Sequence, residues 1–179
     1  MHDESFTYDK TVKEAIIQTV VELVMKTELG RLSVSEIAKA AGVSRSSFYR
    51  NFDSKEQPLV VYIQERYREY FESEISALAH GEAPALDVFL LKRFRFVKEN
   101  AEFFTALKRN NLLEYVFEHM EPDLNHFLSG NISGRSPYYR ALFTGACAGV
   151  IRCWIDRRFK ESPEEMLALF TNGIQDAAQ

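Results

Sequence analysis

The chain has 179 residues, of which 46% are hydrophobic and 27% are charged, and its formal net charge is −4 at pH 7. This composition is typical of a soluble globular protein with a real core, and no stretch approaches the roughly 18 unbroken apolar residues of a membrane span. The acidic balance argues against a protein that coats nucleic acid with its whole surface, although it is compatible with a local basic face.

The first expected helix runs from about Asp9 to Glu28. Its apolar residues recur on one stripe, and Gly30 follows as a C-terminal stop. The residues before it contain acids and no apolar segment, so we expect no secretory signal and a cytoplasmic location. Ser33 and Glu36 then have the spacing of a capping box, which marks the start of a second helix.

A sharp turn and a short third helix follow. Gly42 supplies the backbone freedom that a tight turn needs, and Ser44 is a suitable cap for the next helix. The apolar residues of this stretch predict an inner face packed on the first helix, made of Val34, Ile37, Ala38, Ala41, Val43, Phe48 and Phe52. Two helices joined by about three residues form the helix-turn-helix arrangement.

The outer face of the third helix holds the side-chain types that bind DNA. They are Arg45, Ser46, Tyr49 and Arg50, with Ser47 and Asn51 at the flanks. Arginine reads guanine edges, whereas Ser, Asn and Tyr reach phosphates and bases. Lys55 stands beside the free N–H groups at the start of the following helix, where a phosphate can bind. On this pattern alone, an ordinary helical hairpin with a solvated polar face is an alternative.

The stretch "LSVSEIAKAAGVSRSSFYRNFDSKE" resembles the N-terminal DNA-binding signature of the TetR/AcrR-type repressors. The resemblance covers about Asp9 to Leu59. It implies a homodimeric transcription regulator, usually a repressor, whose second domain binds a small ligand that releases the DNA. The chain departs from the family pattern at Ser46-Ser47-Phe48, where Gly-Thr-Leu is usual, at Asn51, where histidine is usual, and at Pro58, where leucine is typical.

The resemblance also implies roles for individual residues. Ser33 and Ser35 would touch the DNA backbone or a base edge. Arg45, Ser46 and Ser47 would sit at the groove, while Tyr49, Asn51 and Lys55 would clamp phosphates. The whole segment from Ser44 to Asn51, Arg50 included, is expected to enter the major groove.

The rest of the chain also predicts helices. They span Ser54 to about Leu78 and roughly residues 85–99, 101–109, 111–128, 136–158 and 163–176, with Ser162 and Glu165 spaced as a capping box. We therefore expect an all-α fold with a three-helix helix-turn-helix DNA-binding domain at residues 1–55. A helical ligand-binding and dimerisation domain would occupy residues 56–179.

Aromatic residues are dense between positions 86 and 128. A packed core explains them, but such rings also line apolar ligand cavities. The candidate pocket residues are Phe89, Arg93, Phe96, Phe103, Phe104 and Phe117. Arg93 is a candidate anchor for an anionic ligand, and extension of its side chain to solvent is the alternative.

The last two helices carry apolar or small-residue stripes. Ala141, Gly145 and Gly149 follow one another at four-residue steps, which lets another helix approach closely. The last helix adds Met166, Phe170 and Ile174. The resemblance favours a dimer interface made of these two helices, and packing within one chain is the alternative.

The sequence shows no constellation typical of an enzyme. It lacks a nucleophile with a base and an orienting group, and it lacks a glycine-rich phosphate loop. We expect no cofactor, and no metal site either, because Pro122 interrupts the helix that would align His119 with His126. The expected partners are a pseudo-palindromic double-stranded DNA operator, an unknown small molecule and a second copy of the chain. A small-molecule-binding or interaction module that has lost DNA binding is the alternative function.

Overall fold

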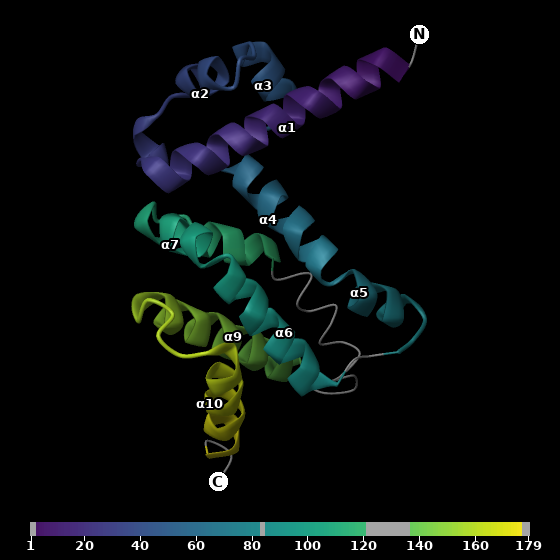
Figure 1. The fold of residues 1–179 in the computed structure, drawn as a ribbon, viewed down its shortest axis with the longest axis vertical. Helices are drawn as coiled ribbons and strands as arrows, with labels where there is room; N and C mark the ends of the chain where they lie inside the picture. The colour runs from purple at the N-terminus through teal and green to yellow at the C-terminus, as the bar shows by residue number, and fades with distance from the viewer. Residues whose placement is uncertain (1–2, 83–84, 121–136, 177–179) are drawn as a thin grey trace. The chain divides into compact units, whose positions relative to one another are not determined.

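A computed structural model describes residues 3–82, 85–120 and 137–176, and all regular structure in these ranges is helical (Figure 1). The predicted all-α fold is therefore confirmed. The chain divides into two compact units. Unit 1 contains Met1–Arg66 and Ala106–Val116, and unit 2 contains Tyr67–Thr105 and Phe117–Gln179.

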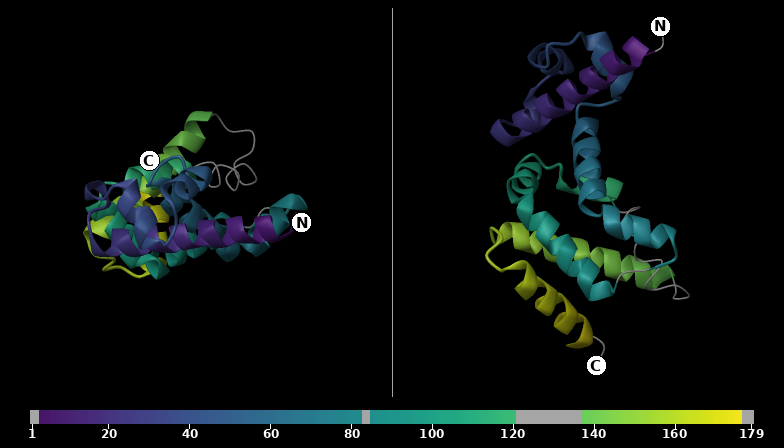
Figure 2. Two further views of the ribbon diagram at one scale, coloured as in Figure 1. Left: turned by 90° about the horizontal axis from the view of Figure 1, so that it is seen from above. Right: turned by 45° about the vertical axis from the view of Figure 1, so that its right-hand side comes forward.

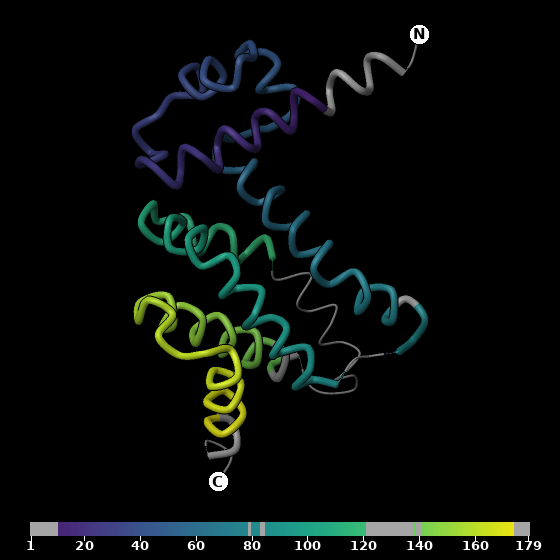
Figure 3. The backbone as a smooth tube through the Cα atoms, viewed as in Figure 1, coloured from purple at the N-terminus to yellow at the C-terminus, as the bar shows by residue number. Residues whose placement is uncertain are grey.

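Unit 1 is built on three helices that lie against one another: α1 (Asp3–Lys26), α2 (Val34–Ala40) and α3 (Arg45–Asn51) (Figures 1 and 3). Helix α1 begins earlier than predicted, and a 3₁₀ turn, η1 (Leu29–Arg31), follows it. Most of the predicted inner face is confirmed as buried, because Ile37, Ala38, Phe48 and Phe52 are at most 2% exposed. These apolar residues hold the two short helices on α1.

Local hydrogen bonds fix the ends of the short helices. The capping box before α2 is confirmed, since Ser33 Oγ accepts from the Glu36 N–H at 3.3 Å and Glu36 Oε2 accepts from the Ser33 N–H at 2.8 Å. Ser44 Oγ accepts from the Ser47 N–H at 3.0 Å and caps α3. Gly42 has a φ of +69°, a left-handed conformation that favours glycine at this turn.

The predicted single helix from Ser54 to about Leu78 is wrong, because the chain forms α4 (Gln57–Tyr70) and α5 (Glu72–Ala79) instead. They are separated at Phe71, whose ψ of 18° departs from helical geometry. Phe71 is completely buried, and its ring stacks on Tyr67 with 4.3 Å between centroids. The break therefore coincides with a residue anchored in the core.

Unit 2 contains α6 (Leu86–Glu99), most of α7 (Ala101–Arg109), α9 (Pro137–Asp156) and α10 (Pro163–Asp176). The predicted ranges of α7 and α10 are confirmed. Residues 113–120 are also helical, whereas the rest of the predicted helix, including Pro122 and His126, lies outside the described residues.

Helices α6, α9 and α10 lie close together (Figures 1 and 2), and one core of aromatic side chains joins them. The Phe94 ring of α6 lies 6.0 Å from Trp154 of α9 and 6.2 Å from Phe170 of α10, centroid to centroid. Phe143 of α9 meets Phe170 at 5.3 Å. The three helices are therefore packed against one another within a single chain.

The chain crosses between the units more than once. Helix α4 continues from unit 1 into unit 2, and α7 starts in unit 2 and ends in unit 1. The predicted domain boundary between residues 55 and 56 stays a prediction, and the two compact units are divided at other positions along the chain. None of the described helices has both the length and the hydropathy needed to cross a membrane.

Candidate functional site

The outer face of α3 presents the side chains expected there. Arg45, Ser46, Tyr49 and Arg50 are all exposed, with Phe48 beneath them fully buried. The Arg45 guanidinium carbon lies 5.5 Å from the centroid of the Tyr49 ring, so the cation is drawn over an aromatic face. Tyr49 remains 46% exposed. This arrangement places two cations and two hydroxyls on one accessible surface.

Ser47 differs from the expectation, because it is only 7% exposed. Its Oγ lies 2.9 Å from Ser44 Oγ and accepts from Arg50 Nη2 at 3.0 Å. Its carbonyl accepts from Asn51 Nδ2 at 2.9 Å. We therefore remove Ser47 from the residues expected to touch DNA, since its polar groups organise α3 from inside.

The start of α2 presents Ser33 and Ser35, which are both exposed. The Ser33 hydroxyl also donates to Glu36 Oε2 at 2.7 Å. The hydrogen bonds from the backbone and side chain of Ser33 hold the pKa of Glu36 below its usual value. The carboxylate of the capping box is thus stabilised in its charged form.

Lys55 has a role that the sequence did not reveal. Its ammonium donates to the carbonyls of Leu29, Gly30 and Leu32 at 3.0, 3.2 and 2.9 Å. It thereby ties the start of α4 to the 3₁₀ turn after α1. The phosphate contact expected for Lys55 stays a prediction, and it has to be compatible with these three hydrogen bonds.

The predicted pocket residues fall into two groups of rings in unit 2. Phe89 and Phe96 belong to a cluster with Tyr67 and Phe71, whose neighbouring centroids are 4.3–6.2 Å apart. The other group is Phe103, Phe104 and Phe117, with Phe104 6.0 Å from Phe103 and 6.2 Å from Phe117. All of these except Phe117 are buried.

Arg93 lies with the first ring cluster and is 8% exposed, so extension of its side chain to solvent is wrong. Its Nη1 donates to Tyr67 Oη at 3.4 Å, and its Nε has no acceptor among the described residues. Cys147 is close enough for the positive charge to act on its thiol. Burial nevertheless raises the pKa of Cys147 to about 11, with Arg93 acting in the opposite direction.

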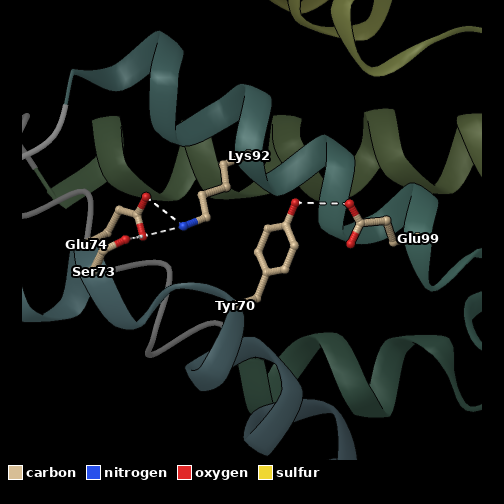
Figure 4. Close-up of polar contacts among 5 residues, drawn as sticks. All are labelled: Tyr70, Ser73, Glu74, Lys92 and Glu99. Carbon is tan, nitrogen blue, oxygen red and sulfur yellow. Dashed lines mark hydrogen bonds and ion pairs between the residues drawn. The ribbon is translucent and has the colours of Figure 1, made fainter.

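Polar contacts join α4 and α5 to α6 beside this cluster (Figure 4). Lys92 Nζ lies 2.8 and 2.6 Å from the two carboxylate oxygens of Glu74, and Tyr70 Oη donates to Glu99 Oε1 at 3.3 Å. Burial, followed by the charge of Glu99, raises the pKa of Tyr70. Sequence reasoning missed these residues, because nothing in their spacing shows that α5 faces α6.

The residues predicted for the dimer interface separate into two sets. Ala141, Gly145 and Gly149 are exposed on α9, as an interface requires. Met166 and Phe170 are instead 5% and 3% exposed, because α10 packs on its own α6 and α9, and we correct their assignment. The side chain of Ile174 lies outside the described part of the chain.

Exposed apolar residues that the sequence reasoning missed extend the surface around these glycines. Tyr138 and Leu142 of α9 are 85% and 70% exposed, and Leu169 of α10 is 59% exposed. Helical spacing places Tyr138, Leu142, Gly145 and Gly149 on one side of α9. We call this surface the α9 outer face. The sequence did contain a signal for this surface, because Tyr138 and Leu142 are four residues apart, as Gly145 and Gly149 are.

Two family models match the chain, one at its N-terminal part and one at its C-terminal part. Residues 16–59 match the model of the bacterial regulatory proteins of the tetR family, and residues 85–176 match that of a transcriptional regulator C-terminal region of the TetR type. The second match alone covers more than half of the chain.

Individual proteins in the comparison share 24–30% of their residues with part of this chain. The uncharacterized HTH-type transcriptional regulator YvdT of Bacillus subtilis is 24% identical over 111 residues, which cover 60% of this chain and 57% of the relative. The uncharacterized HTH-type transcriptional regulator Rv1255c of Mycobacterium tuberculosis is 30% identical over 100 residues, or 53% of this chain and 50% of the relative. The chain thus matches about half the length of these curated relatives.

Solved structures share the fold across nearly the whole chain. A TetR transcriptional regulator from Streptococcus agalactiae superposes with a TM-score of 0.67 at 17% identity, covering 95% of this chain and 97% of that one. The fatty acid degradation regulator FadR from Bacillus halodurans gives a TM-score of 0.55 at 20% identity, covering 90% and 91%. With both regions matched by family models, the chain belongs to the TetR family of transcriptional regulators.

Proposed function

We propose that this chain is a cytoplasmic, homodimeric repressor that binds a pseudo-palindromic DNA operator and leaves it when a small molecule binds. The observation that carries the proposal is the outer face of α3. Arg45 and Arg50 are exposed there beside Ser46 and Tyr49, on a helix whose other side is anchored by Phe48. Arg45 forms no ion pair with any described residue, so its guanidinium is available to a partner.

In this proposal the segment from Ser44 to Asn51 enters the major groove. Arg45 reads a base edge, while Ser46 and Arg50 contact bases or phosphates. Tyr49 and Asn51 hold phosphates, Lys55 attracts them through its positive charge, and Ser33 and Ser35 reach the backbone from the start of α2. The buried Ser47 shapes α3 and makes no contact with DNA.

The α9 outer face is the proposed dimer contact. Its glycines allow a second helix to approach, and Tyr138 and Leu142 are apolar surface that association would cover. A two-fold dimer places two copies of α3 on half-sites about 34–36 Å apart or at a related multiple.

The aromatic residues of unit 2 are the proposed ligand site. One fold relative is a fatty acid degradation regulator, which supports an apolar or amphiphilic ligand for this chain. Such a ligand shifts the population of conformations that bind DNA. Coupling energies of about 1–3 kcal/mol correspond to a roughly 5- to 150-fold loss of DNA affinity.

Capture of genomic DNA fragments tests the proposal. Purified chain should enrich a small set of fragments that share a pseudo-palindrome, whereas Arg45→Ala should enrich this set less and accept other bases at one position of each half-site. Arg95→Ala is a matched control, because Arg95 is exposed but lies on α6 and pairs with Glu164 at 2.7 Å. Enrichment of no sequence by the wild-type chain would favour the alternative of an interaction module without DNA binding.

A further inference from the structure

Arg93 is a buried cation without a matching anion. Arginine is almost never fully buried unless it is paired, because removing its charge from water is costly. Arg93 is nevertheless 8% exposed and forms no ion pair with any described residue. Its single hydrogen bond, from Nη1 to Tyr67 Oη, is long at 3.4 Å. Part of the hydrogen-bonding capacity of the Arg93 guanidinium is therefore unused.

The unused donors lie together on one edge of the guanidinium. Nε is shielded from solvent and has no acceptor, and no described residue accepts from Nη2. Nε and Nη2 point to the same side of the planar group, opposite the Nη1 atom that meets Tyr67. Two parallel donors at this spacing match the two oxygens of one carboxylate.

The neighbouring acidic groups do not supply that carboxylate. Glu74 is bonded to Lys92, and Glu99 accepts from Tyr70 (Figure 4). The thiol of Cys147 is neutral at physiological pH, because burial raises its pKa to about 11. The remaining surroundings are apolar rings, since Tyr67 lies over Arg93 with 5.9 Å from its centroid to Cζ, and Phe71, Phe89 and Phe96 adjoin Tyr67 and each other.

We propose that the Nε–Nη2 edge of Arg93 binds the carboxylate of a monocarboxylic acid whose apolar body lies among the rings around Tyr67. The inference rests on the proposed function, because it names the chemical class of the ligand for that same site. A cation alone would accept any anion, but the aromatic surroundings select one that carries an apolar chain or ring. A neutral ester of the same acid keeps the apolar body and loses the partner of Arg93.

Matched pairs of acid and methyl ester test this inference on the full-length chain. We would titrate decanoate, benzoate and 1-naphthylacetate, each against its methyl ester, by calorimetry and by thermal shift. At least one acid should bind about tenfold or more tightly than its ester, which corresponds to about 1.4 kcal/mol. Arg93→Met should abolish this preference for the acid. Arg95→Met should retain it, since Arg95 lies on the same helix but is exposed and paired with Glu164.

The melting temperature of the ligand-free variant separates a binding role from a structural one. Removing an unpaired buried charge in favour of an apolar side chain of similar length should leave that temperature unchanged or raise it. Arg93→Lys keeps the charge without the planar fork, so it should bind the acid more weakly than the wild type. If Arg93→Met does not fold, the wild-type acid-to-ester ratio and the Arg93→Lys titration still decide the question.

Two results would overturn the inference: equal binding of acid and ester in all three pairs, or an acid preference that survives in Arg93→Met. Operator binding by the ligand-free wild-type chain is measured separately. If the chain binds no operator but discriminates acid from ester through Arg93, the repressor proposal fails and the carboxylate site stands. If it binds operator without any acid preference, the reverse is true.

Discussion

At the scale of single residues, Arg45 and Lys55 hold their positive charges in different ways. Arg45 is exposed and rests only against the Tyr49 ring, whereas the ammonium of Lys55 donates to three main-chain carbonyls. The first side chain is available for a base edge, and the second is committed to a fixed place near the start of α4. Their removal should therefore have different consequences.

We expect Arg45→Ala to cost about 1–3 kcal/mol of operator binding and to relax the preference at one position in each half-site. Lys55→Ala should weaken binding to every sequence and reduce the salt dependence by about one phosphate per subunit. Because Lys55 also holds η1, its variant should melt at a lower temperature, while Arg45→Ala should not. Titrations on operator and scrambled DNA at several salt concentrations, with a melting curve for each variant, measure both effects.

The two cysteines should differ sharply in reactivity. Cys147 is buried with a pKa raised to about 11, so little thiolate forms at neutral pH, whereas Cys153 is exposed. We expect an aromatic disulfide reagent to modify Cys153 in the folded chain and Cys147 only after unfolding. Cys147→Ser and Cys153→Ser assign the two rates. Equal modification of both thiols under native conditions would contradict the buried position of Cys147.

At the scale of elements, the sequence predicted helices that begin at strong local signals. Ser33, Ser44 and Ser162 all cap helices in the structure, and their hydrogen bonds lie within a few residues of sequence. The break at Phe71 was not predictable in this way. It coincides with burial of the ring against residues of α6, such as Phe89 at 5.5 Å, and that contact has no local signature.

Apolar stripes were ambiguous for a related reason. The stripe of α10 predicts that something covers it, but the pattern does not identify the partner. Phe170 turned out to pack on Phe94 and Phe143 of its own chain. The candidate DNA-binding site was also only partly predictable. Helical spacing predicted the exposed face of α3, but it did not predict the hydrogen bonds that Ser47 and Lys55 make within the chain.

The contact between α5 and α6 gives a prediction about pH. Burial acts to raise the pKa of Glu74, but hydrogen bonds from Lys92 and Ser73 outweigh it and hold that pKa below its usual value. A carboxyl group whose pKa is lowered by folding stabilises the fold above its unfolded pKa, and this contribution disappears as the pH falls through the folded pKa.

We therefore expect Glu74→Gln to lower the melting temperature at neutral pH by about 2–4 °C, for a loss of about 1 kcal/mol. The difference from the wild type should vanish at a pH below the folded pKa of Glu74, where both side chains are neutral. Glu72→Gln on the same helix is the control, because Glu72 is exposed and forms no ion pair among the described residues. A pH-independent difference would show that charge is not the cause.

At the scale of the whole molecule, the α9 outer face offers a clean test of assembly. Apart from Gly145 itself, its two chain neighbours and the backbone of its own helix, no described atom lies within 4 Å of the place where a Cβ on Gly145 would be, so a side chain there fits the single chain. Replacement of a helical glycine also favours the helix by up to about 1 kcal/mol. Any loss of assembly would then report on the interface and not on the fold.

We expect Gly145→Arg to shift the wild-type dimer to monomer in sedimentation, with a melting curve that still shows a folded chain. Ser76→Arg places the same side chain on an exposed position of α5 and should leave the dimer intact. Cys153, which is exposed on α9, should react faster with thiol reagents in the Gly145→Arg monomer than in the wild-type dimer. A dimer unchanged by Gly145→Arg would assign the contact to another surface.

Helix α7 passes from unit 2 into unit 1 and is hydrogen-bonded there to the end of α1. It carries Phe103 and Phe104 near its start in unit 2, and the residues at its end belong to unit 1. There Arg109 Nη2 donates to the Met25 carbonyl at 2.7 Å, and Asn110 Oδ1 accepts from the Leu29 N–H at 2.7 Å. Arg109 and Asn110 therefore tie the end of α7 to the end of α1 and to η1.

The three carbonyls around Lys55 also determine which substitutions that position accepts. They accept all three N–H bonds of the ammonium, and the rotamer entropy of this side chain, up to about 2 kcal/mol, is already lost on folding. A compact ammonium donates in three directions from one atom, whereas a guanidinium donates in a plane. Arginine at this position would preserve the charge but not the convergent geometry, and so lysine and arginine are not interchangeable here.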